Sequence, residues 1–255
     1  LHAYIPDISY YTKSFVERRF YYVCSKLYIP SLHVFREKIQ EDITFLDTFM
    51  QHFTVPVTEM FRDATFWSYL RDFILPSLLN RIRGKVKVWF PYCVSGDELY
   101  SFLIMLHEME WIERVEIEVS SVSKLILHHI KTGIFKNHKL NISAENYNHF
   151  KGKNSLSHYL QPRNGQIYRD ISMLKHVKFS QQEIPFDDAP SNQHLIIFRN
   201  KMLYMNQQLQ DQLVNIMHSS LASGGLLAIG VRENIDNHSK FKVLYREENI
   251  YIKNQ

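Results

Sequence analysis

The 255-residue sequence is poor in cysteine and glycine, with two and eight residues respectively. Cys24 and Cys93 lie far apart in no metal-like spacing, which favours a reduced, cytoplasmic compartment over a disulfide-rich scaffold. No apolar run approaches the roughly 20 residues that cross a bilayer, and residues 1–6 lack the pattern of a signal peptide. We therefore expect a cytoplasmic protein without membrane insertion. Eight glycines are few for a nucleotide-binding chain, which usually places glycine where backbone meets phosphate or ribose.

The charge balance is close to even, with 30 basic and 26 acidic residues and a sequence pI of about 8.9. Such a mild excess fits an ordinary surface or an acidic partner, such as a helix that carries glutamates. Two tyrosine pairs lie among basic residues near the N-terminus, but at this net charge we expect no nucleic acid. His128-His129 has no third ligand and Asp187-Asp188 has no calcium-loop pattern, so we expect no metal.

Residues 1–55 are predicted to form a small helical domain. Apolar residues recur at three- and four-residue intervals around Phe15–Phe20 and again from Leu32 to Phe53. Ser31 is the expected N-cap of the second stretch, and Pro56 ends the periodicity. With 45% hydrophobic and 14% aromatic residues, the rest of the chain can bury a second, larger core.

Residues 56–84 are predicted to form a linker and a helix from Phe66 to Leu79, with Pro76 near its end. From Lys85 onward, short apolar runs alternate with amphipathic stretches, so residues 85–255 are predicted to form an α/β domain with a mainly parallel, doubly wound sheet. A small β insertion with an Asn164-Gly165 turn is expected near 152–179, and an antiparallel hairpin at the C-terminus. The expected strands are 86–90, 115–119, 194–198, 226–229, 240–244 and 249–253, and the expected helices are 97–109, 122–132 and 207–221.

The loop that follows the first strand is a candidate ligand site, because open α/β sheets bind ligands beyond the carboxyl ends of their strands. Gly96 and the helix that starts at Asp97 could direct backbone amides and a positive dipole end toward the ligand. One glycine before a helix is also what an ordinary strand-to-helix turn contains.

Three segments resemble the chemotaxis-receptor methyltransferase (CheR) family. They are Val57 to Asp63, Ser95 to Ser101 and Phe198 to Tyr204, which includes the Arg-Asn-x-x-Leu-Tyr pattern. The resemblance spans nearly the whole chain. It implies a Rossmann-like methyltransferase fold, S-adenosylmethionine (SAM) as cofactor, methyl transfer to glutamate side chains, and the cytoplasmic domain of a chemoreceptor or related sensory protein as partner.

The resemblance also implies roles for particular residues. Arg62 would position the acceptor glutamate and Tyr204 would border the reacting methyl group. From the residues alone, a salt bridge to Asp63 or to a neighbouring helix is the preferred explanation of Arg62. Core packing explains Tyr204 as well as a role in the site does. The cofactor-binding residues implied by the resemblance are Thr58, Arg62, Gly96, Glu98, Ser121, Glu183, Ile184, Arg199 and Asn200.

Four positions depart from the family pattern. Pro56 and Glu183 each replace an asparagine, Tyr92 replaces a small residue beside the methionine moiety, and Ser121 replaces the aspartate that holds the ribose. Losing that charge-assisted contact weakens binding by roughly 1.5–3 kcal/mol, or about ten- to a hundredfold. Two hypotheses stay open: a working protein-glutamate methyltransferase, and a binding or regulatory module that has lost SAM affinity.

Overall fold

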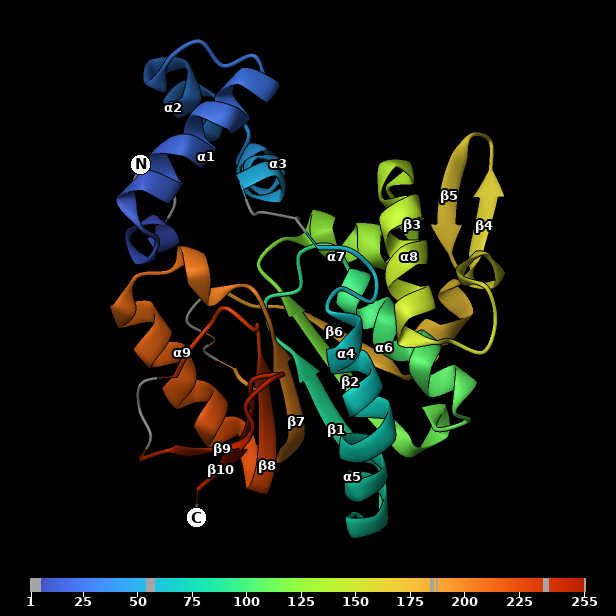
Figure 1. Cartoon of the computed structure of the whole chain (residues 1–255). Coiled ribbons are helices and arrows are strands. Elements are labelled where there is room, and N and C mark those ends of the chain that lie inside the picture. Colours follow the sequence, from blue (N-terminus) through green and yellow to red (C-terminus); the bar gives the residue numbers. More distant parts are fainter. Residues whose placement is uncertain (1–5, 54–57, 184–185, 187, 236–238, 255) are drawn as a thin grey trace.

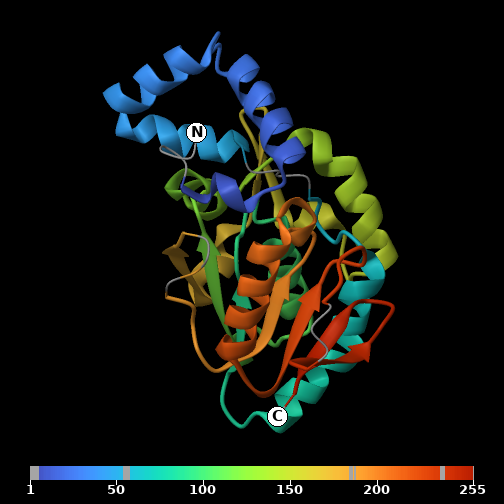
Figure 2. The same cartoon turned by 90° about the vertical axis from the view of Figure 1, so that its left-hand side faces the viewer.

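The computed structural model describes residues 6–53, 58–183, 186, 188–235 and 239–254 (Figure 1). A group of helices from the first 53 residues lies over one end of a large sheet, and further helices cover both faces of that sheet (Figures 1 and 2). Within these residues, no helix combines the length and apolarity needed to span a bilayer.

The N-terminal part is helical, as predicted. Ser31 caps the second α-helix through its Oγ, which accepts a hydrogen bond from the Val34 amide at 3.3 Å. The periodicity from Leu32 to Phe53 is divided between two helices, because the Asp42 carboxylate accepts bonds from the amide and hydroxyl of Thr44 and starts a new helix. The elements are η1 (Pro6–Tyr10), α1 (Lys13–Lys26), α2 (Leu32–Glu41) and α3 (Ile43–Phe53).

The linker helix is longer than predicted and changes its winding. It consists of α4 (Ala64–Tyr69), a π-helical turn η2 (Leu70–Ile74) and α5 (Leu75–Arg81). Pro76 is the second residue of α5 and lies near the end of the whole helical stretch, as predicted. Since proline lacks an N–H and its ring crowds the carbonyl one turn earlier, the wider π turn just before it allows the helix to continue.

The large sheet has the strand order β6-β2-β1-β7-β8-β10-β9. Strands β6, β2, β1, β7 and β8 are parallel, and β10 and β9 form the expected antiparallel C-terminal hairpin. One boundary was wrong: 177–179 belong to β6 of this sheet, not to the insertion. The strands are β1 (Val86–Phe90), β2 (Val115–Ser121), β6 (Val177–Gln181), β7 (Gln193–Phe198), β8 (Leu221–Ile229), β9 (Phe241–Tyr245) and β10 (Ile250–Lys253).

A second, three-stranded antiparallel sheet stands beside the large one. Its strands are β3 (Ile134–Phe135), β5 (Gln166–Arg169) and β4 (Leu160–Arg163), in that order. Asn164 and Gly165 both have positive φ, at 49° and 76°, and form the predicted two-residue hairpin turn. The small sheet starts earlier than the predicted insertion, because β3 precedes the helix α8 (Leu140–Phe150) and pairs back onto β5.

Alternate residues of the central strands pack against different layers. In β7, Leu195 and Ile197 face the cluster that contains α4, α5, α6 and α8, whereas Ile196 and Phe198 face α9 and the N-terminal helices. The period of two along each strand thus divides the core into two layers. The remaining elements are α6 (Asp97–Glu108), η3 (Ile112–Arg114), α7 (Lys124–Lys131), η4 (Asn137–Lys139), η5 (Leu156–Tyr159), η6 (Ile171–His176), η7 (Met202–Tyr204) and α9 (Gln207–Ser220).

Candidate functional site

The loop between β1 and α6 crosses the carboxyl ends of the central strands. The Cys93 amide donates to the Ser120 carbonyl oxygen at 2.7 Å, which ties this loop to the end of β2. Gly96 has φ +76° and a Cβ placed on it would lie 3.1 Å from Ile130 Cγ1. Glycine is therefore needed here both for its backbone conformation and for its close approach to α7.

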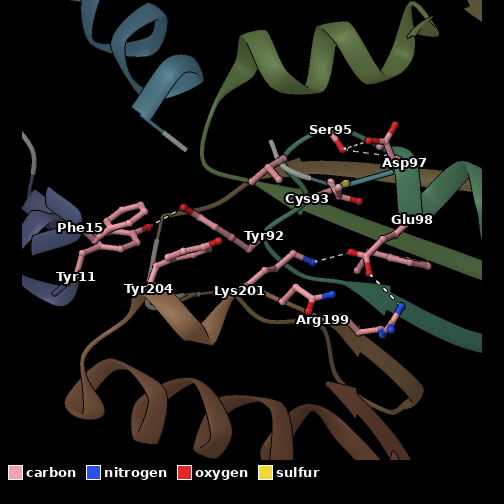
Figure 3. A pocket seen from close by; sticks show the side chains of 15 residues that line it. Tyr11, Phe15, Tyr92, Cys93, Ser95, Asp97, Glu98, Arg199, Lys201 and Tyr204 are labelled. Atoms are coloured by element: carbon pink, nitrogen blue, oxygen red, sulfur yellow. Dashed lines mark hydrogen bonds and ion pairs between the residues drawn. The ribbon is translucent and has the colours of Figure 1, made fainter. Parts of the chain in front are cut away.

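A pocket of about 40 Å³ lies between this loop, the loop after β7 and the N-terminal helices (Figure 3). Six of the residues predicted to bind or react meet in its lining, although they come from distant parts of the chain. They are Thr58, Gly96, Glu98, Arg199, Asn200 and Tyr204. Tyr204 also packs on Phe15, with ring centroids 4.9 Å apart, so it serves both the pocket and the core.

Tyr92 is a buried aromatic residue in the lining of this pocket. Its hydroxyl oxygen lies 2.6 Å from that of Tyr11, and Figure 3 shows the two side chains meeting across the pocket. The residue is 6% exposed and has a left-handed φ of 54°, which a non-glycine residue adopts at a cost. A pocket for a small molecule usually measures about 300–1,000 Å³. Because the pocket is smaller than this, we expect the Tyr92 ring to move when a ligand of the cofactor's size enters.

A charged cluster connects the linker, α6 and the loop after β7. Glu98 lies 3.2 Å from Lys201 Nζ and 3.8 Å from Arg199 Nη1. Arg199 is fully buried, pairs with Asp63 at 2.6 Å and lies over the ring of Phe66 at 3.9 Å. Arg199 therefore fixes the linker to the end of β7. Lys201 was not predicted, although it stands inside the matched segment Phe198 to Tyr204.

Glu233 holds the loop after β7 in place through hydrogen bonds with its backbone. Its buried carboxylate accepts hydrogen bonds from the amides of Asn200 at 2.8 Å, Met202 at 2.6 Å and Gly230 at 2.6 Å. A Cβ on Gly230 would lie 2.5 Å from Asn200 Oδ1, so glycine is required where these two loops meet. The Gly-x-x-Glu spacing of Gly230 and Glu233 was the sequence signal for this contact.

Two hydroxyl groups near the pocket are buried without a partner. Within the part of the chain that the structure describes, neither Ser121 Oγ nor Thr58 Oγ1 has a hydrogen-bond partner. Ser121 is fully buried at the end of β2 and does not line the pocket itself. Buried hydroxyls of this kind normally bond to something, so they suit a ligand that brings hydroxyl or amino groups.

Asp97 was not predicted as a site residue, yet it joins three elements at the edge of the pocket. Its carboxylate pairs with Arg169 of β5 and with Lys139 Nζ at 2.8 Å, and it accepts a bond from Ser95 Oγ at 2.9 Å. Lys139 also donates to the Thr58 carbonyl oxygen. The acidic residue directly after Gly96, at the start of a helix, was its sequence signal.

Not all predicted residues come together. The Arg62 side chain is 36% exposed, stands outside the pocket lining and lies 4.0 Å from the Glu59 carboxylate. Asp63 pairs with Arg199. Glu183 is exposed and also outside the lining. Ile184 and Pro56 lie outside the described residues.

The pocket holds no activated thiol, since burial raises the pKa of Cys93 and keeps it protonated. Among the residues that the structure describes, no group of three metal-ligating side chains comes together. The acidic Glu98 and the unpartnered hydroxyls suit a polar, cationic ligand with sugar hydroxyls. The chemistry of the pocket thus fits SAM, on the condition that the Tyr92 ring moves.

Comparisons of the sequence with a family profile and with known relatives support the same cofactor. A family profile described as CheR methyltransferase, SAM binding domain, matches residues 56–250. A Pseudomonas putida protein named Cher3 is 28% identical over 253 residues, which cover 98% of this chain and 92% of its own. The chemotaxis protein methyltransferase of Listeria monocytogenes is 27% identical over 250 residues, covering 97% and 91%. The solved rRNA methyltransferase aviRa of Streptomyces viridochromogenes has a TM-score of 0.41 and 14% identity, covering 78% of this chain and 86% of its own.

The matched range contains the linker, the loop after β1 and the loop after β7, which together supply most of the pocket. The chain therefore belongs to the CheR methyltransferase family, and its cofactor is SAM.

Proposed function

We propose that this protein transfers a methyl group from SAM to glutamate carboxylates in the cytoplasmic domain of a chemoreceptor-type protein, within the cytoplasm. The observation that carries the proposal is the gathering of Thr58, Glu98, Arg199, Asn200 and Tyr204 around one pocket at the carboxyl ends of β1 and β7. These are the positions at which the sequence agrees with the family pattern.

Methyl transfer to a carboxylate requires little from side chains. The acceptor is already nucleophilic at neutral pH, so the protein has to align the two reactants and exclude water. SAM, when bound, supplies an electrophilic methyl group. Glu98, which lines the pocket, would attract its amino group. Arg62, a partly exposed guanidinium of the linker, would orient the incoming carboxylate. Tyr204 would exclude water between them.

The alternative function is a protein-binding or regulatory module with impaired SAM binding. The buried contact between Tyr11 and Tyr92 favours it, because this contact occupies the pocket. The two functions differ in whether the cofactor binds at all.

Calorimetric titration of the whole chain with SAM and with S-adenosylhomocysteine (SAH) distinguishes them. We expect SAH to bind, Glu98→Gln to weaken it by about tenfold through loss of a charge-assisted contact, and Glu145→Gln, an exposed change on α8, to leave it unchanged. Transfer of labelled methyl groups to chemoreceptor cytoplasmic domains then tests the acceptor. A folded protein that binds neither ligand at millimolar concentration would refute the enzymatic function and leave the module.

A further inference from the structure

A second, larger cavity of about 580 Å³ lies between the N-terminal helices and the α/β domain. Helices α1 and α3 form one side, and α7 with the segment after β3 forms the other. It shares the wall of Val94, Ser95 and Asp97 with the first pocket but is otherwise separate from it. The charged and imidazole side chains in its lining that matter here are Lys26, Lys136, Lys139, Arg169, His52 and His129.

Positive charge dominates this cavity, since Asp97 is the only acidic residue among the described residues that line it. Arg169 and Lys139 already pair with Asp97. In the described residues no acidic side chain forms an ion pair with Lys26 or Lys136, which come from opposite sides of the cavity. Like charges that face each other across a cavity repel, and an anion between them removes the repulsion.

The surrounding groups respond to this excess of charge. Although Lys136 keeps contact with solvent, burial and the charges of Lys139 and Lys26 lower its pKa. Burial, followed by Lys26 and Lys136, lowers the pKa of His52. His129 has a lowered pKa too, mainly through burial, and its Nδ1 lies 2.7 Å from Gln51 Nε2 across the two sides. The imidazoles of His52 and His129 are therefore neutral near pH 7, and each can form hydrogen bonds.

We propose that this cavity binds a phosphate-bearing small molecule, with its phosphate between Lys26 and Lys136. A phosphate monoester carries a charge of about −1.5 to −2 at pH 7 and three strong acceptor oxygens, which matches two lysines and adjacent imidazoles. Ile126, Ile130 and Ile134 form an apolar wall for the organic part. The volume is that of a small-molecule site, and residues of the N-terminal helices and of the α/β domain both line it, which favours a compact ligand that contacts both sides. The proposal does not depend on methyl transfer.

Thermal-shift and calorimetric titration of the full chain with pyrophosphate, AMP and ATP, at physiological salt, tests this site. We expect at least one probe to bind with a Kd below about 1 mM, and Lys26→Gln and Lys136→Gln each to weaken it about tenfold by removing one charge-assisted contact. Lys124→Gln, which removes one exposed charge from α7 outside the cavity, is the matched control and should leave binding unchanged.

Stability without ligand provides a second readout. Lys136→Gln should raise the Tm of the ligand-free protein, since it removes repulsion, while it reduces the Tm gain that the phosphate probe gives. Three results would overturn the proposal. The first is that none of the probes binds. The second is that Lys201→Gln, in the first pocket, abolishes binding while the cavity variants retain it. The third is that only a glutamate-rich peptide binds through Lys26 and Lys136.

Discussion

At the scale of single residues, Tyr92 is the side chain that we expect to limit access to the proposed cofactor pocket. The family pattern has a small residue there, and the backbone still has the left-handed φ of 54° that suits glycine. The tyrosine ring occupies the pocket and its hydroxyl is fixed by Tyr11. One side chain thus combines an unfavourable backbone conformation with a steric block.

Tyr92→Gly is therefore expected to tighten SAH binding by about tenfold or more, equivalent to at least ~1.4 kcal/mol. Removing the ring enlarges the pocket, and glycine adopts the local conformation without strain. Calorimetry on the folded variant measures the change. Tyr11→Phe is the control, because it removes the hydroxyl contact and leaves both rings in place. Unchanged SAH affinity in Tyr92→Gly would mean that the ring is not the obstacle.

Ser121 is the second residue at which the pattern changed. It is fully buried and its hydroxyl has no partner among the described residues. We expect Ser121→Asp to lower the Tm of the ligand-free protein, since it buries an unpaired carboxylate, and to increase the Tm gain caused by SAH. Combined with Tyr92→Gly it should give the tightest binding. Ser121→Ala, which deletes the unpartnered hydroxyl, should show neither effect. An equal Tm gain from SAH in the unchanged protein, Ser121→Asp and Ser121→Ala would contradict this role.

At the scale of elements, Asp97 holds the small sheet to α6. Its side chain is fully buried between Arg169 of β5 and Lys139 of η4. Asp97→Asn leaves two buried cations without their partner, and breaking a buried pair in this way costs about 3–5 kcal/mol. Urea unfolding measures the loss. Asp211→Asn, an exposed change on α9, should cost far less, and an equal loss in both variants would show that Asp97 has no special structural role.

Glu233 connects the turn after β8 with the loop after β7 by accepting three backbone N–H bonds. Glu233→Gln replaces one acceptor oxygen by a donor, which leaves at least one buried amide unpaired and costs about 1–3 kcal/mol. Because the same loop carries Arg199 and Asn200, SAH binding should weaken as well. Glu247→Gln, on the exposed turn before β10, is the matched control. Loss of stability without any loss of SAH affinity would separate this loop from the cofactor.

At the scale of the whole molecule, acid should destabilise the fold through its histidines. Burial is the largest cause of the lowered pKa of His52, His129, His194 and His218, and neighbouring positive charges add to it. The unfolded chain then binds more protons than the folded one, so stability is full above the unfolded value of 6.5 and falls as pH drops below it. Urea midpoints between pH 7.5 and 5.5 test this. A constant midpoint across that range would contradict it.

Much of the fold was predictable because strand and helix periods are local properties. The parallel sheet, the C-terminal hairpin and the Asn164-Gly165 turn were confirmed. The break at Asp42 and the π turn before Pro76 were missed, since each depends on hydrogen bonds that a hydrophobic period does not register. Strand β6 was missed because its partly polar residues become a strand only by pairing with β2.

By itself the sequence determined the alternation of strands and helices in the α/β domain and the family, and it predicted the loop after β1 as the site, because these depend on periodicity and short motifs. Only the tertiary structure decided what fills the pocket, since the Tyr11 and Tyr92 hydroxyls are 81 residues apart in the chain. It also decided that Arg199 and Asp97 form buried ion pairs with distant segments, and that Lys26 and Lys136 face one cavity. Contacts of this kind arise when the helices pack over the sheet, and no local pattern encodes them.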